Sequence, residues 1–229
     1  MAKKEKSEEV IGDVSIKQLD AYLKANKKDH LNYDEQVNWV ASTGSLEFDA
    51  ELGGGFGPGA YKVAGASFAG KTNCVLQCVK NALETIPNSK GLWVKAEGRL
   101  DQEVQDRSGV KFVYKAEEWQ VGTCFVLETN IFELVTDLIN NLIKNNPSEI
   151  RYVMGIDSMD GLIRRADMEK DAEEGERVGG GALLTSVMFK KANLVLNKKG
   201  HVLFMIHQIR AKIETNQYAP KDQNKSVGG

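Results

Sequence analysis

Residues 65–72 restrict the fold of this 229-residue chain more than any other segment. Their sequence, GASFAGKT, fits the pattern G-x-x-x-x-G-K-S/T, whose glycines let successive backbone N–H groups curl around an anionic oxygen. A buried strand is predicted just before the segment, over residues 60–64, and a helix over residues 72–83. The N-terminus of that helix adds the positive end of its dipole. The order strand, glycine-rich loop, helix therefore predicts a phosphate-binding loop in an α/β fold.

Two side chains of this loop bring a charge and a metal-ligating oxygen. Lys71 is predicted to neutralise the outer phosphates of a nucleotide, and the Thr72 hydroxyl to ligate Mg²⁺. The alternative is a glycine-rich turn that binds nothing, which the neighbouring strand and helix disfavour. The predicted cofactor-binding loop comprises Gly65, Ala66, Ser67, Phe68, Ala69, Gly70, Lys71 and Thr72.

Apolar runs alternate with amphipathic segments along the rest of the chain, which is typical of strand–helix–strand units. Continuous apolar runs bounded by polar residues predict strands that are buried on both faces. We therefore expect a mostly parallel sheet with helices on both faces. Its predicted strands are residues 60–64, 91–96, 152–156 and 202–206, and its predicted helices are residues 72–83, 100–108, 131–144 and 182–197.

The N-terminal part of the chain differs from the rest. Residues 1–12 alternate Lys and Glu with few apolar side chains, which predicts a frayed arm. Over residues 15–27 the apolar side chains fall on one helical face. We therefore divide the chain into a short helical appendage, residues 1–40, and a core, residues 41–229.

Composition excludes several classes of protein. Hydrophobic residues make up 41% of the chain and charged residues 27%, as in an ordinary globular protein. The longest apolar run, residues 202–206, is far shorter than a membrane span, and the charged start, MAKKEKSEEV, is unlike a secretory signal. Three cysteines give no disulfide framework, and a net charge of −2 excludes one strongly basic surface. We expect a cytoplasmic protein that contacts no membrane.

Three further polar side chains follow predicted strands. Asp157 ends the run 152–156, and a carboxylate there can hold a water on Mg²⁺ beside Thr72. Glu97 ends another strand at the edge where such folds bind ligands, so it is placed to orient or deprotonate an attacking water. Gln208 closes the last strand, where it can hydrogen-bond a γ-phosphate and sense ATP against ADP. The plainer alternatives are a solvated loop acid for Glu97 and a polar strand end for Gln208.

Four segments together resemble the RecA family of recombination ATPases, and most closely the recombinases that phages encode. Residues 42–55 resemble the stretch before the family's phosphate loop, and residues 95–101 stand where the family keeps its catalytic glutamate. Residues 155–162 resemble its magnesium-binding strand. Residues 207–213 resemble the segment whose glutamine couples ATP to the second DNA-binding loop. The resemblance implies a RecA-like P-loop NTPase core over residues 41–229.

The resemblance implies a site that uses ATP and Mg²⁺. It makes Glu97 the base and Gln208 the nucleotide sensor, and it places Asp101 near the adenine. The implied catalytic residues are Lys71, Glu97 and Gln208, and the implied metal ligands are Thr72 and Asp157.

The resemblance also implies two loops that face DNA, residues 164–180 and 210–229. Residues 210–229 carry four bases against two acids, and this local excess suits contacts with phosphates. Residues 164–177 carry four bases but six acids, so charge alone favours a solvated loop there. The side chains predicted to bind DNA are Arg164, Arg165, Arg177, Arg210, Lys212, Lys221 and Lys225.

The function that the resemblance implies is a DNA-dependent ATPase that forms helical filaments on single-stranded DNA. Such a protein promotes homologous recombination and strand exchange with double-stranded DNA, in the cytoplasm of a bacterium or a phage-infected host. The helix over residues 15–27 would contact a neighbouring protomer or cover its own sheet. One alternative is an ATP-binding accessory or assembly protein of the same fold with little turnover. Another is a small-metabolite kinase, but the chain has no Arg-rich lid segment.

The chain departs from the family pattern in three places. Lys95 stands where bacterial members commonly have an acidic residue, and Val104 where an aromatic side chain often stacks on the base. The chain ends at Gly229, where the family continues with further strands and a C-terminal portion. We therefore expect the core to be incomplete at its C-terminal end.

Overall fold

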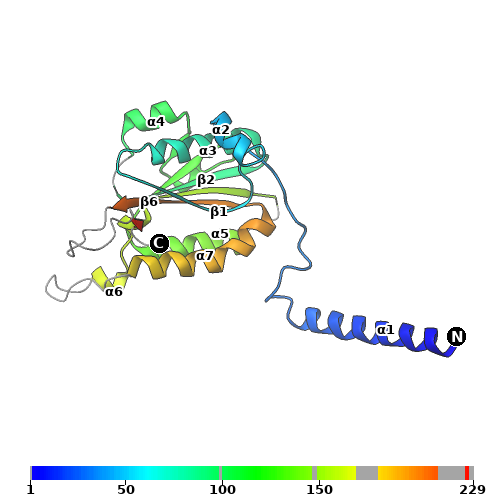
Figure 1. Ribbon diagram of the computed structural model, residues 1–229. Helices are drawn as coiled ribbons and strands as arrows, with labels where there is room; N and C mark the ends of the chain where they lie inside the picture. Colours follow the sequence, from blue (N-terminus) through cyan, green and yellow to red (C-terminus); the bar gives the residue numbers. More distant parts are fainter. Residues whose placement is uncertain (1, 98–99, 146–148, 169–179, 211–224, 227–229) are drawn as a thin grey trace, which may run out of the picture. The chain divides into compact units, whose positions relative to one another are not determined.

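The computed structural model describes residues 2–97, 100–145, 149–168, 180–210 and 225–226 (Figure 1). The chain divides into two compact units, Met1–Glu35 and Gln36–Gly229. Among the described residues, no helix combines the length and the apolar character that crossing a membrane requires.

The first unit is built on one helix, α1 (Ala2–Ala25). Its apolar side chains Ile16, Leu19 and Tyr22 are exposed, and Lys24 pairs with Asp20 one turn earlier at 2.7 Å. The prediction of a frayed arm over residues 1–12 is wrong, because the helix begins at Ala2. The Ala, Lys and Glu of this segment are strong helix formers, and this preference prevails where few apolar residues mark a pattern.

The second unit is built on a sheet whose six main strands are all parallel, in the order β1-β6-β5-β2-β4-β3 (Figure 1). A short strand, β7, pairs antiparallel with the end of β6. The bounds are β1 (Gly59–Gly65), β2 (Ser89–Lys95), β3 (Phe112–Val113), β4 (Cys124–Glu128), β5 (Arg151–Asp157), β6 (Val202–Arg210) and β7 (Lys225–Ser226). The predicted α/β fold with a mostly parallel sheet is confirmed.

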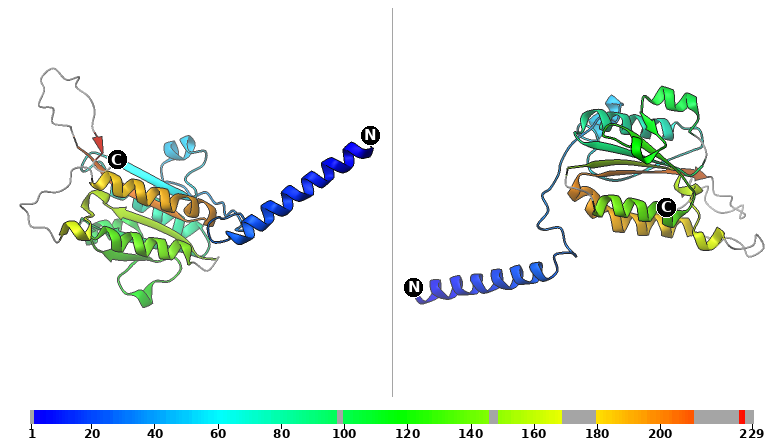
Figure 2. Two further views of the ribbon diagram at one scale, coloured as in Figure 1. Left: turned by 90° about the horizontal axis from the view of Figure 1, so that it is seen from below. Right: turned by 180° about the vertical axis from the view of Figure 1, so that it is seen from behind.

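Helices cover both faces of the sheet. Figure 1 shows α3 and α4 on one face with α2 nearby, and α5 and α7 on the other. Figure 2 shows α5 and α7 running side by side. The helices are α2 (Leu46–Glu51), α3 (Lys71–Thr85), α4 (Gln102–Ser108), α5 (Phe132–Lys144), α6 (Arg165–Met168) and α7 (Gly180–Lys199), with the 3-10 turns η1 (Ala116–Glu118) and η2 (Met159–Gly161).

Each face of the sheet has its own apolar core. On the α3 side, Leu76 and Val79 of the helix pack with Trp93 and Phe204 of the strands. On the other side, α5 and α7 pack on β2, β5 and β6 through an apolar cluster that includes Ile139. Strands buried on both faces explain why β5 and β6 read as continuous apolar runs in the sequence.

Candidate functional site

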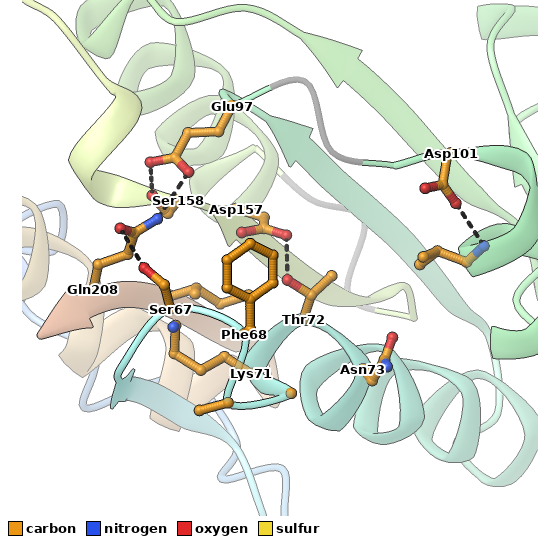
Figure 3. Close-up of a pocket in the computed structure, with 14 residues that line it drawn as sticks. Ser67, Phe68, Lys71, Thr72, Asn73, Glu97, Asp101, Asp157, Ser158 and Gln208 are labelled. Carbon is orange, nitrogen blue, oxygen red and sulfur yellow. Dashed lines mark hydrogen bonds between the residues drawn. The ribbon is translucent and has the colours of Figure 1, made fainter.

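Four parallel strands bring their carboxyl ends together at one edge of the sheet. The order β1-β6-β5-β2 makes them neighbours, and the register pairs Gly65 with Gln208 and Lys95 with Asp157. A pocket of about 460 Å³ opens at this edge (Figure 3). Its lining is Ser67, Phe68, Ala69, Gly70, Lys71, Thr72, Asn73, Glu97, Asp101, Val104, Asp157, Ser158, Ile206 and Gln208.

The glycine-rich loop joins β1 to α3 along one side of the pocket. Gly70 precedes the helix with φ of 80°, a left-handed conformation that glycine adopts without strain. The Lys71 ammonium curls back over the loop and donates to the carbonyl oxygens of Gly65, at 2.9 Å, and Ala66, at 2.7 Å. Phe68 lines the pocket although its side chain is 91% exposed. The loop thus holds one cation at the N-terminus of a 15-residue helix.

Thr72 and Asp157 form a pair in the middle of the pocket. The Thr72 hydroxyl donates to Asp157 Oδ2 at 2.7 Å (Figure 3). A hydroxyl and a carboxylate oxygen are hard ligands of the kind that Mg²⁺ prefers, and Mg²⁺ keeps its remaining positions for waters and phosphates. The Thr72–Asp157 pair therefore fits Mg²⁺.

Glu97 is fixed by its backbone and by both carboxylate oxygens. Its N–H donates to Asp157 O at 3.3 Å, which continues the β2–β5 pairing past the end of β2. The Ser158 hydroxyl donates to Oε1 at 2.5 Å, and Gln208 Nε2 donates to Oε2 at 3.2 Å. Across the pocket, the Ser67 hydroxyl donates to Gln208 Oε1 at 3.4 Å. These bonds form a continuous chain from the phosphate loop to the acid (Figure 3).

Asp101 lies on the other side of the pocket from Gln208 (Figure 3). It is the N-cap of α4, where Oδ1 accepts from the Val104 N–H at 2.9 Å. Asp and Asn are preferred at N-caps because they satisfy a helix N–H that would otherwise lack a partner. The carboxylate thus stabilises the helix that closes this side of the pocket, and its place near an adenine stays a prediction.

The residues predicted to contact DNA are described only in part. Arg164 donates through Nε to Asp167 Oδ2 at 2.6 Å, so an acid three residues along the chain offsets its charge. Arg165 borders a shallow hollow together with Glu133 and Asp137. The backbones of Arg210 and Lys225 face each other where β6 pairs with β7. The remaining predicted positions, Arg177, Lys212 and Lys221, lie outside the described residues.

Sequence reasoning did not assign Ser158 or Asn73 to the site, yet both line the pocket. The sequence could have placed Ser158 in the site, because this residue directly follows a strand that ends in an acid at the ligand edge of the sheet. For Asn73, only its position after the phosphate loop pointed to the site.

The two cysteines of α3 differ in exposure. Cys78 is buried whereas Cys74 is exposed, although the two lie four residues apart on the same helix. A hydrogen bond from the Cys78 thiol lowers the pKa of Cys74 to about 6, while the same contact and burial raise the pKa of Cys78.

Comparisons with known proteins agree with the fold. The family model for the RecA N-terminal domain matches residues 13–227. The chain is 29% identical to Protein RecA of Mycobacterium avium over 176 residues, which is 76% of this chain and 46% of that protein. It is 27% identical to Protein RecA of Rippkaea orientalis over 183 residues, 79% of this chain and 48% of that protein. The chain thus spans about half the length of these relatives, and it belongs to the RecA N-terminal domain family.

Proposed function

We propose that this chain is a DNA-dependent ATPase that assembles into helical filaments on single-stranded DNA and promotes strand exchange with double-stranded DNA. The observation that carries the proposal is the hydrogen-bonded chain Ser67–Gln208–Glu97. It connects the phosphate loop to the end of β6, and residues 210–229 beyond that end are predicted to face DNA. Its relation to the recombinases of phages stays a prediction.

Each residue at the edge has a chemical task in this proposal. Lys71 binds the outer phosphates of ATP, and Thr72 and Asp157 hold Mg²⁺. Bound there, Mg²⁺ neutralises phosphate charge, which matters because the pocket lining holds three carboxylates and one lysine. Glu97 accepts the proton of the attacking water. Nucleotide binding should therefore require Mg²⁺.

Gln208 links nucleotide state to DNA in this proposal. Its side-chain amide contacts both Glu97 and Ser67, so the oxygens of a γ-phosphate that enters beside the loop compete for the same donors, Gln208 Nε2 and the Ser67 hydroxyl. When Gln208 turns toward the γ-phosphate, Glu97 loses one donor and is free to accept from water. Gln208 lies two residues before the end of β6 and so close to the segment predicted to bind DNA. The turn of Gln208 toward the γ-phosphate therefore favours the conformation of that segment that binds DNA in the presence of ATP.

A salt series of single-stranded DNA binding by the full chain tests the proposal, with an ATP analogue, ADP or no nucleotide. We expect the tightest binding with the ATP analogue, with an affinity that falls as salt rises because phosphate contacts release counterions. The variant Gln208→Ala should bind nucleotide but lose the difference between the ATP analogue and ADP. Equal DNA affinity in all three nucleotide states of the unmodified chain would contradict the proposal.

One observation favours a second candidate, an ATP-binding accessory protein of the same fold with little turnover. Both carboxylate oxygens of Glu97 already accept hydrogen bonds, from Ser158 and Gln208, and a base so engaged is less available to water. Phosphate release in the presence of DNA and Mg²⁺ separates the two candidates. DNA binding that depends on nucleotide, without measurable release, would favour the accessory protein.

A further inference from the structure

The turn after β5 touches both the acid and the glutamine of the site. Ser158 donates its hydroxyl to Glu97 Oε1 at 2.5 Å. Three residues on, a Cβ at Gly161 would lie 2.6 Å from Glu97 Cγ, so only glycine fits against that side chain. Between them, Asp160 Oδ2 accepts the backbone N–H of Gln208 at 2.5 Å. One short turn, residues 158–161, therefore holds Glu97 and Gln208 relative to each other.

Asp160 supplies a hydrogen-bond acceptor to β6 at the point where the β5–β6 pairing ends. The β5–β6 pairing runs from Val153–Val202 to Ile156–Met205 and then stops, because the chain turns into η2. The Gln208 N–H points to the β5 side of β6, where no strand remains to accept it. The carboxylate of Asp160 takes the place of that missing carbonyl, and a charged acceptor makes a stronger bond than a peptide carbonyl.

The burial of the Asp160 carboxylate lowers the stability of the fold. Its side chain is 2% exposed and lies beside the buried imidazole of His207, with Oδ1 at 3.9 Å from Nδ1. Among the described residues, no donor reaches Oδ1 within hydrogen-bonding distance. A buried carboxylate with one oxygen unsatisfied costs stability, and such groups in native proteins call for an explanation other than packing. Asp160 does not line the pocket, so contact with nucleotide is not that explanation.

We propose that Asp160 is a positioning residue for Gln208, an inference that rests on the function proposed above. By fixing the backbone of Gln208 near the end of β6, Asp160 sets the side-chain amide within reach of both Glu97 and Ser67. It thereby sets how strongly the nucleotide state changes DNA affinity. Asp160 acts through Gln208 and touches neither nucleotide nor DNA.

The test compares three variants of the full chain. Asp160→Ala removes the acceptor, whereas Asp160→Asn keeps an oxygen that can accept the Gln208 N–H. Val153→Ala is the matched control, because it weakens the core of β5, the strand that leads into the turn, without touching Gln208. For each protein we would measure the melting temperature, the affinity for the ATP analogue, and the ratio of DNA affinities with ATP analogue and ADP.

We expect Asp160→Ala to keep its affinity for the ATP analogue within a few-fold and to lose the DNA-affinity ratio by about tenfold, the loss typical of one charge-assisted hydrogen bond. Asp160→Asn should keep most of the ratio, and Val153→Ala should keep all of it while melting earlier. A ratio unchanged in Asp160→Ala, or lost equally in Val153→Ala, would overturn the inference.

A second readout decides the inference without DNA. The Gln208 side-chain amide can be assigned in a ¹⁵N spectrum as the signal that disappears in Gln208→Glu. In Asp160→Ala this signal should move to the position of a solvent-exposed glutamine, and in Asp160→Asn it should stay. An unchanged signal in Asp160→Ala would refute the positioning role. If nucleotide does not change the DNA affinity of the unmodified chain but the signal moves, the proposed function fails and the positioning of Gln208 by Asp160 stands.

Discussion

Lys71 is the one cation among the described residues that line the pocket, a lining it shares with the carboxylates of Glu97, Asp101 and Asp157. Its ammonium already lies over the loop, held by the carbonyl oxygens of Gly65 and Ala66. The charge is therefore placed before a phosphate arrives, and little reorganisation is needed for binding.

We predict that Lys71→Ala lowers ATP affinity by about ten- to a hundredfold, because the phosphates lose one charge-assisted hydrogen bond. Titration of a fluorescent ATP analogue in Mg²⁺ measures the change. Lys80→Ala is the control, since Lys80 lies farther along the same helix and pairs with Glu84 away from the pocket. Equal affinity of the unmodified and Lys71→Ala chains would remove the assignment of the phosphate-binding loop.

Glu97→Gln tests the proposed base while keeping the shape of the side chain. The glutamine oxygen can still accept from the Ser158 hydroxyl, so the turn after β5 should stay in place. We predict that nucleotide affinity changes by a few-fold at most, and that phosphate release falls at least about a hundredfold, the usual size of general base catalysis. Single-turnover hydrolysis with DNA present measures it. Full activity in this variant would mean that another group takes the proton.

At the scale of elements, the sequence predicts those helices and strands whose own residues show a clear hydrophobic pattern. The strand and helix around the phosphate loop, α5 and the apolar runs of β5 and β6 all show a clear period or a buried run, and each lies within a few residues of its predicted bounds. Strand β4 was not predicted, because Cys124–Glu128 is five residues long and its buried and half-buried positions alternate too briefly to stand out.

The contacts of the site lie beyond local patterns. Gln208 pairs with Gly65 in the β1–β6 register, although the two residues are 143 positions apart in the sequence. The sequence shows that β2, β5 and β6 each carry a polar side chain at or beside their carboxyl ends. Because parallel strands place their carboxyl ends at one edge of the sheet, these side chains are expected to lie close together. That Asp160 accepts the Gln208 N–H is not predictable, because it depends on where β5 turns away from β6.

Strand β5 also carries a packing constraint of its own. Gly155 stands opposite Trp93 of β2 in the parallel register, and a Cβ at Gly155 would lie 2.6 Å from Cζ3 of the indole. Trp93 is fully buried and its ring is rigid, so it cannot move aside within this core. The absence of a side chain at one position is what admits the largest side chain at the other.

We predict that Gly155→Ala lowers the free energy of unfolding by about 1–3 kcal/mol, the usual cost of overpacking a core. Urea denaturation followed by tryptophan fluorescence measures the loss. Met154→Leu, a swap of similar volume on the opposite face of the same strand, should cost less than about 1.5 kcal/mol. If Gly155→Ala were as stable as the unmodified chain, the indole would have to move in the folded state.

For the whole second unit, His201 makes stability depend on pH. It lies between α7 and β6, at the opposite end of the sheet from the pocket, where Nδ1 accepts the Tyr152 N–H at 3.1 Å and the His201 carbonyl accepts the Gly59 N–H at 2.9 Å. Burial, together with the positive charges of Arg151 and Lys199, lowers the pKa of His201 to about 3. The imidazole is therefore neutral in the folded chain above about pH 3.

The sign of the effect follows from proton binding. In the unfolded chain the imidazole takes a proton near its ordinary pKa of about 6.5, whereas the folded chain refuses it until about pH 3. Between these values the unfolded state binds more protons, so stability falls as the pH falls, by about 1.4 kcal/mol per pH unit. Lowering the pH from 7 to 5 should therefore remove about 2 kcal/mol through this group alone.

Urea denaturation at pH 7, 6 and 5, for the unmodified chain and for His201→Asn, isolates this term because all other titrating groups are shared. We predict that His201→Asn is less stable at pH 7, where it loses the bond to Tyr152, and that the gap between the two proteins narrows by about 2 kcal/mol at pH 5. Should the variant not fold, the imidazole Cε1–H signal of His201 in the unmodified chain decides the matter, since it should stay at its neutral position down to pH 4. A gap that is constant with pH, or an imidazole that titrates near pH 6, would show that the folded chain admits the proton and that His201 does not limit its stability in acid.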